Sequence, residues 1–115
     1  MSITKKTLKL SLLERVELLG KFPREGGIKK MVVFEDLVKK IRFSQQEIKD
    51  FEIKDVINGE TTSISWNIKG GKSNANFNVT DVEIEEILKL FDLLDASEKF
   101  PTTLLNVYSQ LQKLK

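Results

Sequence analysis

The sequence predicts a single domain of the α+β class, mostly helical, over residues 1–115. Three capping boxes, in which Ser or Thr is followed three residues later by Glu, precede stretches where apolar residues recur at steps of three and four. Between the second and third boxes the apolar residues alternate with polar ones, which is typical of strands. We therefore expect about five helices and a small antiparallel hairpin or meander.

The N-terminal part predicts a short strand and then a helix. Leucines alternate with polar residues over residues 8–12, as in a half-buried strand. The capping box of Ser11 and Glu14 starts a helix that is expected to end at Gly20. The expected buried stripe of this helix is Leu12, Val16 and Leu19.

A basic loop follows over residues 21–27, with one proline and two glycines. Loops carry function more often than core helices do, so Lys21, Phe22 and Arg24 are candidate binding residues. We favour the alternative that Phe22 holds the loop against the core.

The longest helical pattern begins at Ile28, and a second, short helix follows the capping box that Ser44 opens. The expected core face of the long helix is Met31, Phe34, Leu37, Val38 and Ile41. Its acids stand four residues before lysines, the favourable order for the ion pairs Glu35–Lys39 and Asp36–Lys40. Such a helix pair is compatible with a helix-turn-helix, but more often it forms a corner of an α-rich core.

Residues 53–57 and 61–68 predict a hairpin about a type I′ turn at Asn58–Gly59. After a turn at residues 70–74, residues 75–79 predict a third strand. This order is compatible with a winged helix, with the tip of the wing at Lys69–Lys72. Gly70–Ser73 imitates the end of a phosphate-binding loop, but Trp66 stands where the first glycine is required, so the match is rejected.

A third capping box, at Thr80 and Glu83, starts a helix with an acidic outer face, and a final helix begins near Pro101. The residues expected to be buried across the whole domain are Leu19, Phe34, Leu37, Ile41, Trp66, Ile87, Phe91, Tyr108 and Leu111.

Composition argues against an enzyme. The chain has no cysteine and no histidine, which excludes disulfides, thiolate zinc sites and a Ser–His triad. Carboxylate chemistry stays open, but the acids lie on predicted helix exteriors, where they commonly keep a surface solvated. We expect no catalytic residues, cofactor or metal. No apolar run suits a membrane span or signal peptide, so a cytoplasmic protein is expected.

Charge is divided unevenly along the chain. Residues 1–42 hold 11 Lys/Arg against 5 Asp/Glu, and residues 43–115 hold 8 against 12. The favoured explanation is that the two parts attract each other within the fold. The alternative is nucleic-acid binding through a basic side of the molecule. That side would be made of Lys29, Lys30, Lys39, Lys40, Arg42, Lys69 and Lys72. The acidic helix after Ser44 makes reading of duplex DNA by that helix improbable.

A protein-binding surface is the leading functional hypothesis. On the helix after Thr80, two apolar residues fall among acids on the expected outer face, which would give charge steering and an apolar anchor. The residues of this surface are Val82, Glu85, Glu86, Asp92 and Leu93. Alternatively, Leu93 packs under the final helix, or a second copy of the chain covers it.

The first half of the chain resembles small proteins encoded by phages and prophages. The matching residues are Leu12-Leu13-Glu14-Arg15-Val16, Leu18-Leu19, Pro23, Glu25-Gly26, Leu37, Lys40-Ile41, Phe43-Ser44 and Glu47-Ile48. The resemblance implies a protein that acts by binding, either as an antagonist of host defence such as an anti-CRISPR or as a minor virion component. Such a protein would work in the host cytosol.

Overall fold

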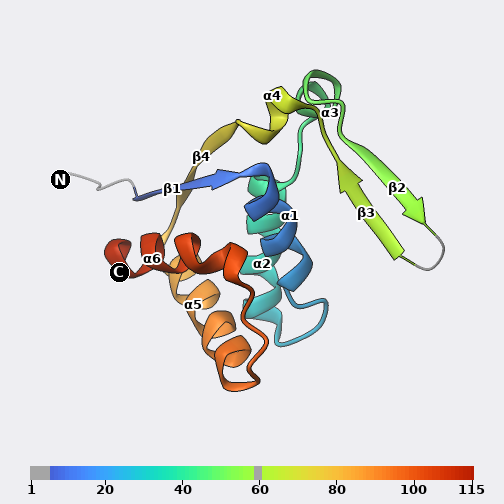
Figure 1. Cartoon of the computed structure of the whole chain (residues 1–115). Coiled ribbons are helices and arrows are strands. Elements are labelled where there is room, and N and C mark those ends of the chain that lie inside the picture. Colours follow the sequence, from blue (N-terminus) through green and yellow to red (C-terminus); the bar gives the residue numbers. More distant parts are fainter. Residues whose placement is uncertain (1–5, 59–60) are drawn as a thin grey trace.

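The computed structural model describes residues 6–58 and 61–115 (Figure 1). The strands are β1 (Lys6–Ser11), β2 (Lys54–Asn58), β3 (Thr61–Ser65) and β4 (Asn74–Val79). The helices are α1 (Leu12–Lys21), α2 (Ile28–Ile41), α3 (Gln45–Asp50), α4 (Ile68–Gly71), α5 (Asp81–Ala96) and α6 (Leu105–Leu114), with the 3-10 helix η1 (Thr102–Leu104) before α6. The predicted α+β class, mostly helical, is confirmed. None of the helices in this described part has the length and apolar character that crossing a membrane requires.

All three predicted capping boxes form. At the start of α1 the Ser11 hydroxyl accepts a hydrogen bond from the Glu14 amide at 3.2 Å, and the Glu14 carboxylate accepts one from the Ser11 amide at 2.9 Å. The same reciprocal bonds start α3 and α5, at Ser44/Glu47 and Thr80/Glu83. These local bonds satisfy amides that a helix leaves free, and they fix where three of the helices begin.

The first strand lies against the last, not beside its neighbours in sequence. β1 pairs antiparallel with β4, with Leu8 opposite Phe77 and Leu10 opposite Ala75. Both leucines are fully buried. The pairing joins two segments that are far apart in the sequence, and both leucines belong to the hydrophobic core.

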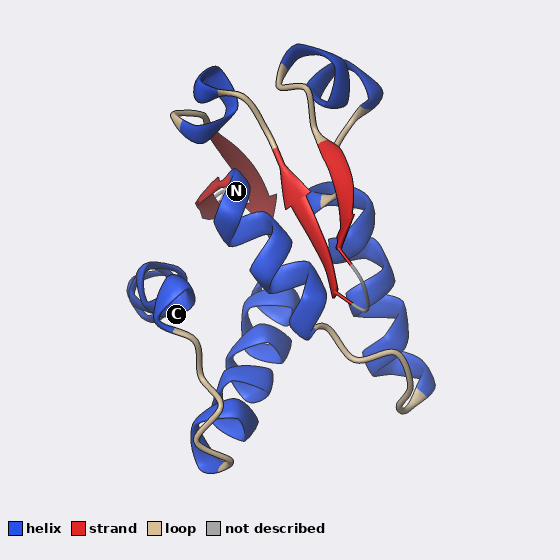
Figure 2. Cartoon of the chain, turned by 45° about the vertical axis from the view of Figure 1, so that its right-hand side comes forward, coloured by secondary structure: helices blue, strands red, loops and turns tan. Residues whose placement is uncertain are grey.

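The predicted hairpin is confirmed as β2–β3, but the predicted meander is wrong. Residues 68–71 form helix α4, not a turn or a wing tip, and the chain after α4 leads β4 back to β1. Asn58 is the last residue of β2, opposite Thr61, and the Gly59 of the predicted type I′ turn lies outside the described residues. Figure 1 shows the hairpin projecting to the right of the helices, and Figure 2 shows it in front of them.

The core lies between α1, α2, α5, α6 and the inner side of β1. Among the residues expected to be buried, Phe34, Leu37, Ile41, Ile87, Phe91 and Leu111 are confirmed. Leu19 is only partly buried, packed against the core. Trp66, in the connection from β3 to α4, is half-buried, and Tyr108 is 37 % exposed at the edge of α6. Phe22 is buried against Phe34, with ring centroids 5.0 Å apart, so it holds the 21–27 loop to the core as expected.

Helix α1 buries Leu12 as predicted, but its other two fully buried positions differ from the predicted ones. Leu12, Arg15 and Leu18 are buried, whereas Val16 and Leu19 lie at the flank. Arg15 is tolerated inside because its polar atoms are bonded. Its guanidinium donates to the carbonyls of Ile41 at 2.9 Å and Arg42 at 3.0 Å. It also makes two bonds to the Glu47 carboxylate, at 2.5 and 3.0 Å. This cluster fixes the turn between α2 and α3 onto α1.

Ion pairs join the basic first part of the chain to the acidic remainder, which confirms the favoured explanation of the charge asymmetry. The pairs are Lys6–Asp81, Arg15–Glu47 and Lys40–Glu83. The predicted pair Glu35–Lys39 forms at 3.6 Å. The predicted Asp36–Lys40 pair does not form, because the Lys40 ammonium contacts both oxygens of the buried Glu83 carboxylate at 2.7 and 2.9 Å.

Candidate protein-binding face

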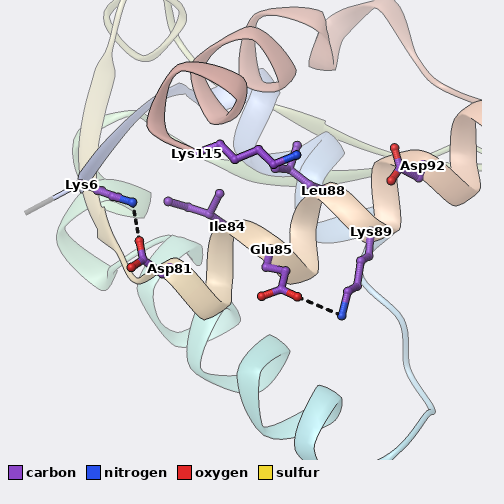
Figure 3. Close-up of a pocket in the computed structure, with 8 residues that line it drawn as sticks. All are labelled: Lys6, Asp81, Ile84, Glu85, Leu88, Lys89, Asp92 and Lys115. Carbon is purple, nitrogen blue, oxygen red and sulfur yellow. Dashed lines mark hydrogen bonds and ion pairs between the residues drawn. The ribbon is translucent and has the colours of Figure 1, made fainter.

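Helix α5 presents its outer surface between two neighbours. It runs alongside α2 in the opposite direction, because Lys40 contacts Glu83 near the start of α5 while Lys30 lines the same hollow as Leu93 near its end. On its other side it faces Lys6 of β1, Lys115 and α6 (Figure 3). The exposed strip of α5 therefore lies between α2 and the C-terminal segment.

The five residues predicted for a protein-binding surface divide between these two sides. Val82, Glu86 and Leu93 line hollows beside α2, Glu85 lines the hollow that faces Lys6 and Lys115, and Asp92 lines hollows on both sides. Val82 and Leu93 are exposed by 56 % and 60 %, so Leu93 does not pack under α6. Eleven residues of helix place them about 16 Å apart, so they do not form one apolar spot.

Most of the acids on α5 are neutralised within the chain. Lys89 lies 3.3 Å from the Glu85 carboxylate and 3.5 Å from that of Glu86. Its hydrogen bond to Glu85, together with the attraction of both carboxylates, raises the pKa of the Lys89 ammonium. Lys6 contacts Asp81 at the start of the helix. Figure 3 shows this contact and that of Lys89 with Glu85, with Asp92 set apart at the far end.

Asp92 and Asp95 take part in no ion pair among the described residues, although Asp92 lines two hollows that contain lysines. Both are exposed, and no lysine or arginine described in the structure lies within ion-pair distance of either. They stand at positions i and i+3, so their side chains are neighbours on the helix surface. The negative charge that α5 offers to a partner is thus concentrated in its C-terminal half.

A hollow lined by aromatic rings lies next to these two acids. Phe91 is buried, and the Phe100 ring meets it edge-on with centroids 5.0 Å apart. Tyr108 stands beside both, 6.1 Å from Phe100 and 6.4 Å from Phe91. The hollow is completed by Leu105, Asp92 and Asp95. Sequence reasoning missed this site because it assigned Tyr108 to the core. The available signal was two acids spaced by three on one helix, followed by Phe100 in the connection and Tyr108 on the next helix.

The seven residues predicted to bind nucleic acid do not form one surface. Lys29 and Lys30 stand at the start of α2, and Arg42 follows its end, about 20 Å along the helix. Lys39 and Lys40 are engaged with carboxylates. Lys69 and Lys72 lie on and just after α4, at the opposite end of the molecule from the start of α2 (Figure 1).

Lys21 and Arg24 flank the buried Phe22 in the 21–27 loop, with Arg24 exposed and Lys21 half-buried. Within residues 6–58 and 61–115, no three acidic side chains gather as they would around a metal ion. Comparison of the chain with protein-family models, curated proteins and solved structures yields no significant match.

Proposed function

We propose that the protein is a non-enzymatic protein-binding module that docks through the C-terminal half of α5. The docking surface, called here the α5 docking face, consists of Asp92, Leu93, Asp95 and Leu105. The observation that supports it is a coincidence of exposed apolar area and uncompensated charge. Leu93 is 60 % exposed and Leu105 53 % exposed. Asp92 lines one hollow with Leu93 and, together with Asp95, another with Leu105.

This combination is what a protein interface needs. Buried apolar side chains supply most of the binding free energy, while charges around them steer the partner and set its orientation. Elsewhere on α5 the acids are paired with lysines, which leaves less charge for attraction. The resemblance to phage-encoded proteins suggests that the partner is a bacterial protein. We propose that the present protein acts as an antagonist of host defence.

The test is affinity capture from bacterial lysate with matched variants. Leu93→Asp places a charge in the docking face, and Ile68→Asp places one on an equally accessible side chain of α4, since Ile68 is 80 % exposed. Because both side chains are exposed, both variants should fold as the wild type does. We expect wild type and Ile68→Asp to recover the same protein and Leu93→Asp to lose it.

Recovery of that partner by Leu93→Asp as well would place the docking surface elsewhere. If wild type recovers no protein in any host lysate and sediments as a monomer, the proposal of a binding module fails. Sedimentation as a large homo-oligomer would instead favour the alternative role as a minor virion component.

A further inference from the structure

The aromatic hollow between α5 and α6 has a lining that selects for one kind of side chain. It is lined by three aromatic rings, one exposed leucine and two exposed carboxylates. Its charged lining residues are Asp92 and Asp95, and no lysine or arginine lines it. The hollow that faces Lys6 and Lys115 shares Asp92 with the aromatic hollow, but contains lysines and acids in equal number.

We propose that this hollow is a receptor site for an arginine side chain of a partner protein. This rests on the proposed function, because it assigns the chemistry of the partner that docks on α5. An arginine fits for three reasons. Its flat guanidinium stacks on aromatic faces, its forked N–H groups can donate to two carboxylates at once, and its methylene stem packs against leucine.

The spacing of the two acids favours a forked donor over a point charge. Asp92 and Asp95 are i and i+3 on one helix, with Cβ atoms about 5–6 Å apart. A guanidinium lying on Tyr108 can donate to both, whereas an ammonium reaches them one at a time. Neither acid is held by another described side chain, so an incoming cation displaces no internal ion pair.

The rings also have a structural role, which the test must separate from binding. Phe91 is 1 % exposed and belongs to the core, so its replacement would disturb folding. Asp92 and Asp95 are exposed, and their amide variants keep size and shape. Glu85 provides a matched control, because it is an exposed acid on the same helix that lies outside the hollow.

The experiment is a nuclear magnetic resonance titration with a capped Gly-Arg-Gly peptide and with its citrulline analogue, which keeps the shape and removes the charge. We expect the arginine peptide to shift the Tyr108 ring signals and the amides of residues 92–96 and 105–108. The citrulline peptide should bind at least about fivefold more weakly. The double variant Asp92→Asn, Asp95→Asn should lose a similar factor, and Glu85→Gln should bind as the wild type does.

Equal shifts with both peptides, or arginine binding that the double variant retains, would overturn the arginine site. Shifts confined to Glu85 and Glu86 would overturn it as well, because they would indicate a general attraction to acids. The lysate capture separates this result from the proposed function. A partner lost by Leu93→Asp but kept by the double variant would preserve the α5 docking face and remove the arginine site. Loss of the partner in Leu93→Asp and in the double variant alike would support the α5 docking face and the arginine site together.

Discussion

The ion pair between Arg15 and Glu47 makes a prediction about stability whose size follows from its geometry. Arg15 is 1 % exposed, and the Glu47 side chain is 27 % exposed. The hydrogen bonds from Arg15 lower the pKa of the Glu47 carboxyl from 4.5 to about 2. Partial burial acts in the opposite direction and raises this pKa. A shift of that size corresponds to a ceiling of ~3 kcal/mol. Because solvent reaches Glu47, we expect Glu47→Gln to cost about 1–2 kcal/mol at pH 7.

Replacing the arginine should cost more than replacing the acid. Arg15→Ala leaves two backbone carbonyls without their donor and the Glu47 carboxylate without its cation. It also opens a cavity beside Phe43 and Phe77. Removing one partner of a buried pair typically costs about 3–5 kcal/mol. The control is Glu35→Gln, which removes the exposed pair with Lys39 and should change the free energy of unfolding by less than about 0.5 kcal/mol.

The pH dependence gives the sharper measurement. Because the pKa of the carboxyl is lower in the folded protein, the ionised carboxylate stabilises the fold at pH values above the pKa of the unfolded chain. This stabilisation is lost as the pH falls through the folded pKa. In urea denaturation, the difference between wild type and Glu47→Gln should be constant above about pH 5 and shrink between pH 4.5 and 2. A difference that is absent at pH 7, or that persists unchanged at pH 2, would refute the assignment of this ion pair.

Three further predictions concern the core, a close backbone approach and the basic residues. Phe91→Ala should lower the free energy of unfolding by about 3–5 kcal/mol in chemical denaturation, and a change below ~1 kcal/mol would show that the ring is not central. Gly70→Ala should destabilise by about 1–3 kcal/mol, because its Cβ would lie 2.9 Å from that of Phe51. Gly20→Ala, at a position of α1 where nothing lies near the added Cβ, should instead raise the melting temperature. A stabilising Gly70→Ala together with a destabilising Gly20→Ala would contradict the packing. Labelled DNA and RNA should bind at most weakly at low salt, because Lys39 and Lys40 are engaged and the other basic residues are dispersed; tight, steeply salt-dependent association would restore the nucleic-acid alternative.

The helices could be placed from the sequence because their signals are local. A capping box is complete within four residues, and all three boxes form as predicted. The hairpin was found for the same reason, since its strands are close in sequence. The pairing of β1 with β4 could not be found this way. It pairs Lys6 with Val79. Whether β4 pairs with β1 or with β3 depends on how α4 redirects the chain.

The buried Arg15 was missed for an energetic reason. Arginine is rarely buried, so the buried face of α1 was predicted from its apolar residues alone. The charge is stable inside only because Glu47 and two carbonyls of the α2–α3 turn converge on it. Those partners lie 26 residues or more along the chain, beyond the range of any helical periodicity.

The uneven charge of the sequence explains why one end of α5 stays negative. Two basic residues from other elements, Lys6 and Lys40, form ion pairs with Asp81 and Glu83 in its first turn. Lys89 engages the acids of its middle. Beyond that point Lys30 and Lys115 line hollows with Asp92 without forming an ion pair with it, and aromatic side chains line the hollow that Asp92 shares with Asp95. Ion pairing among the described residues of α5 thus ends before the aromatic hollow, and this is where we propose that a cation from a partner binds.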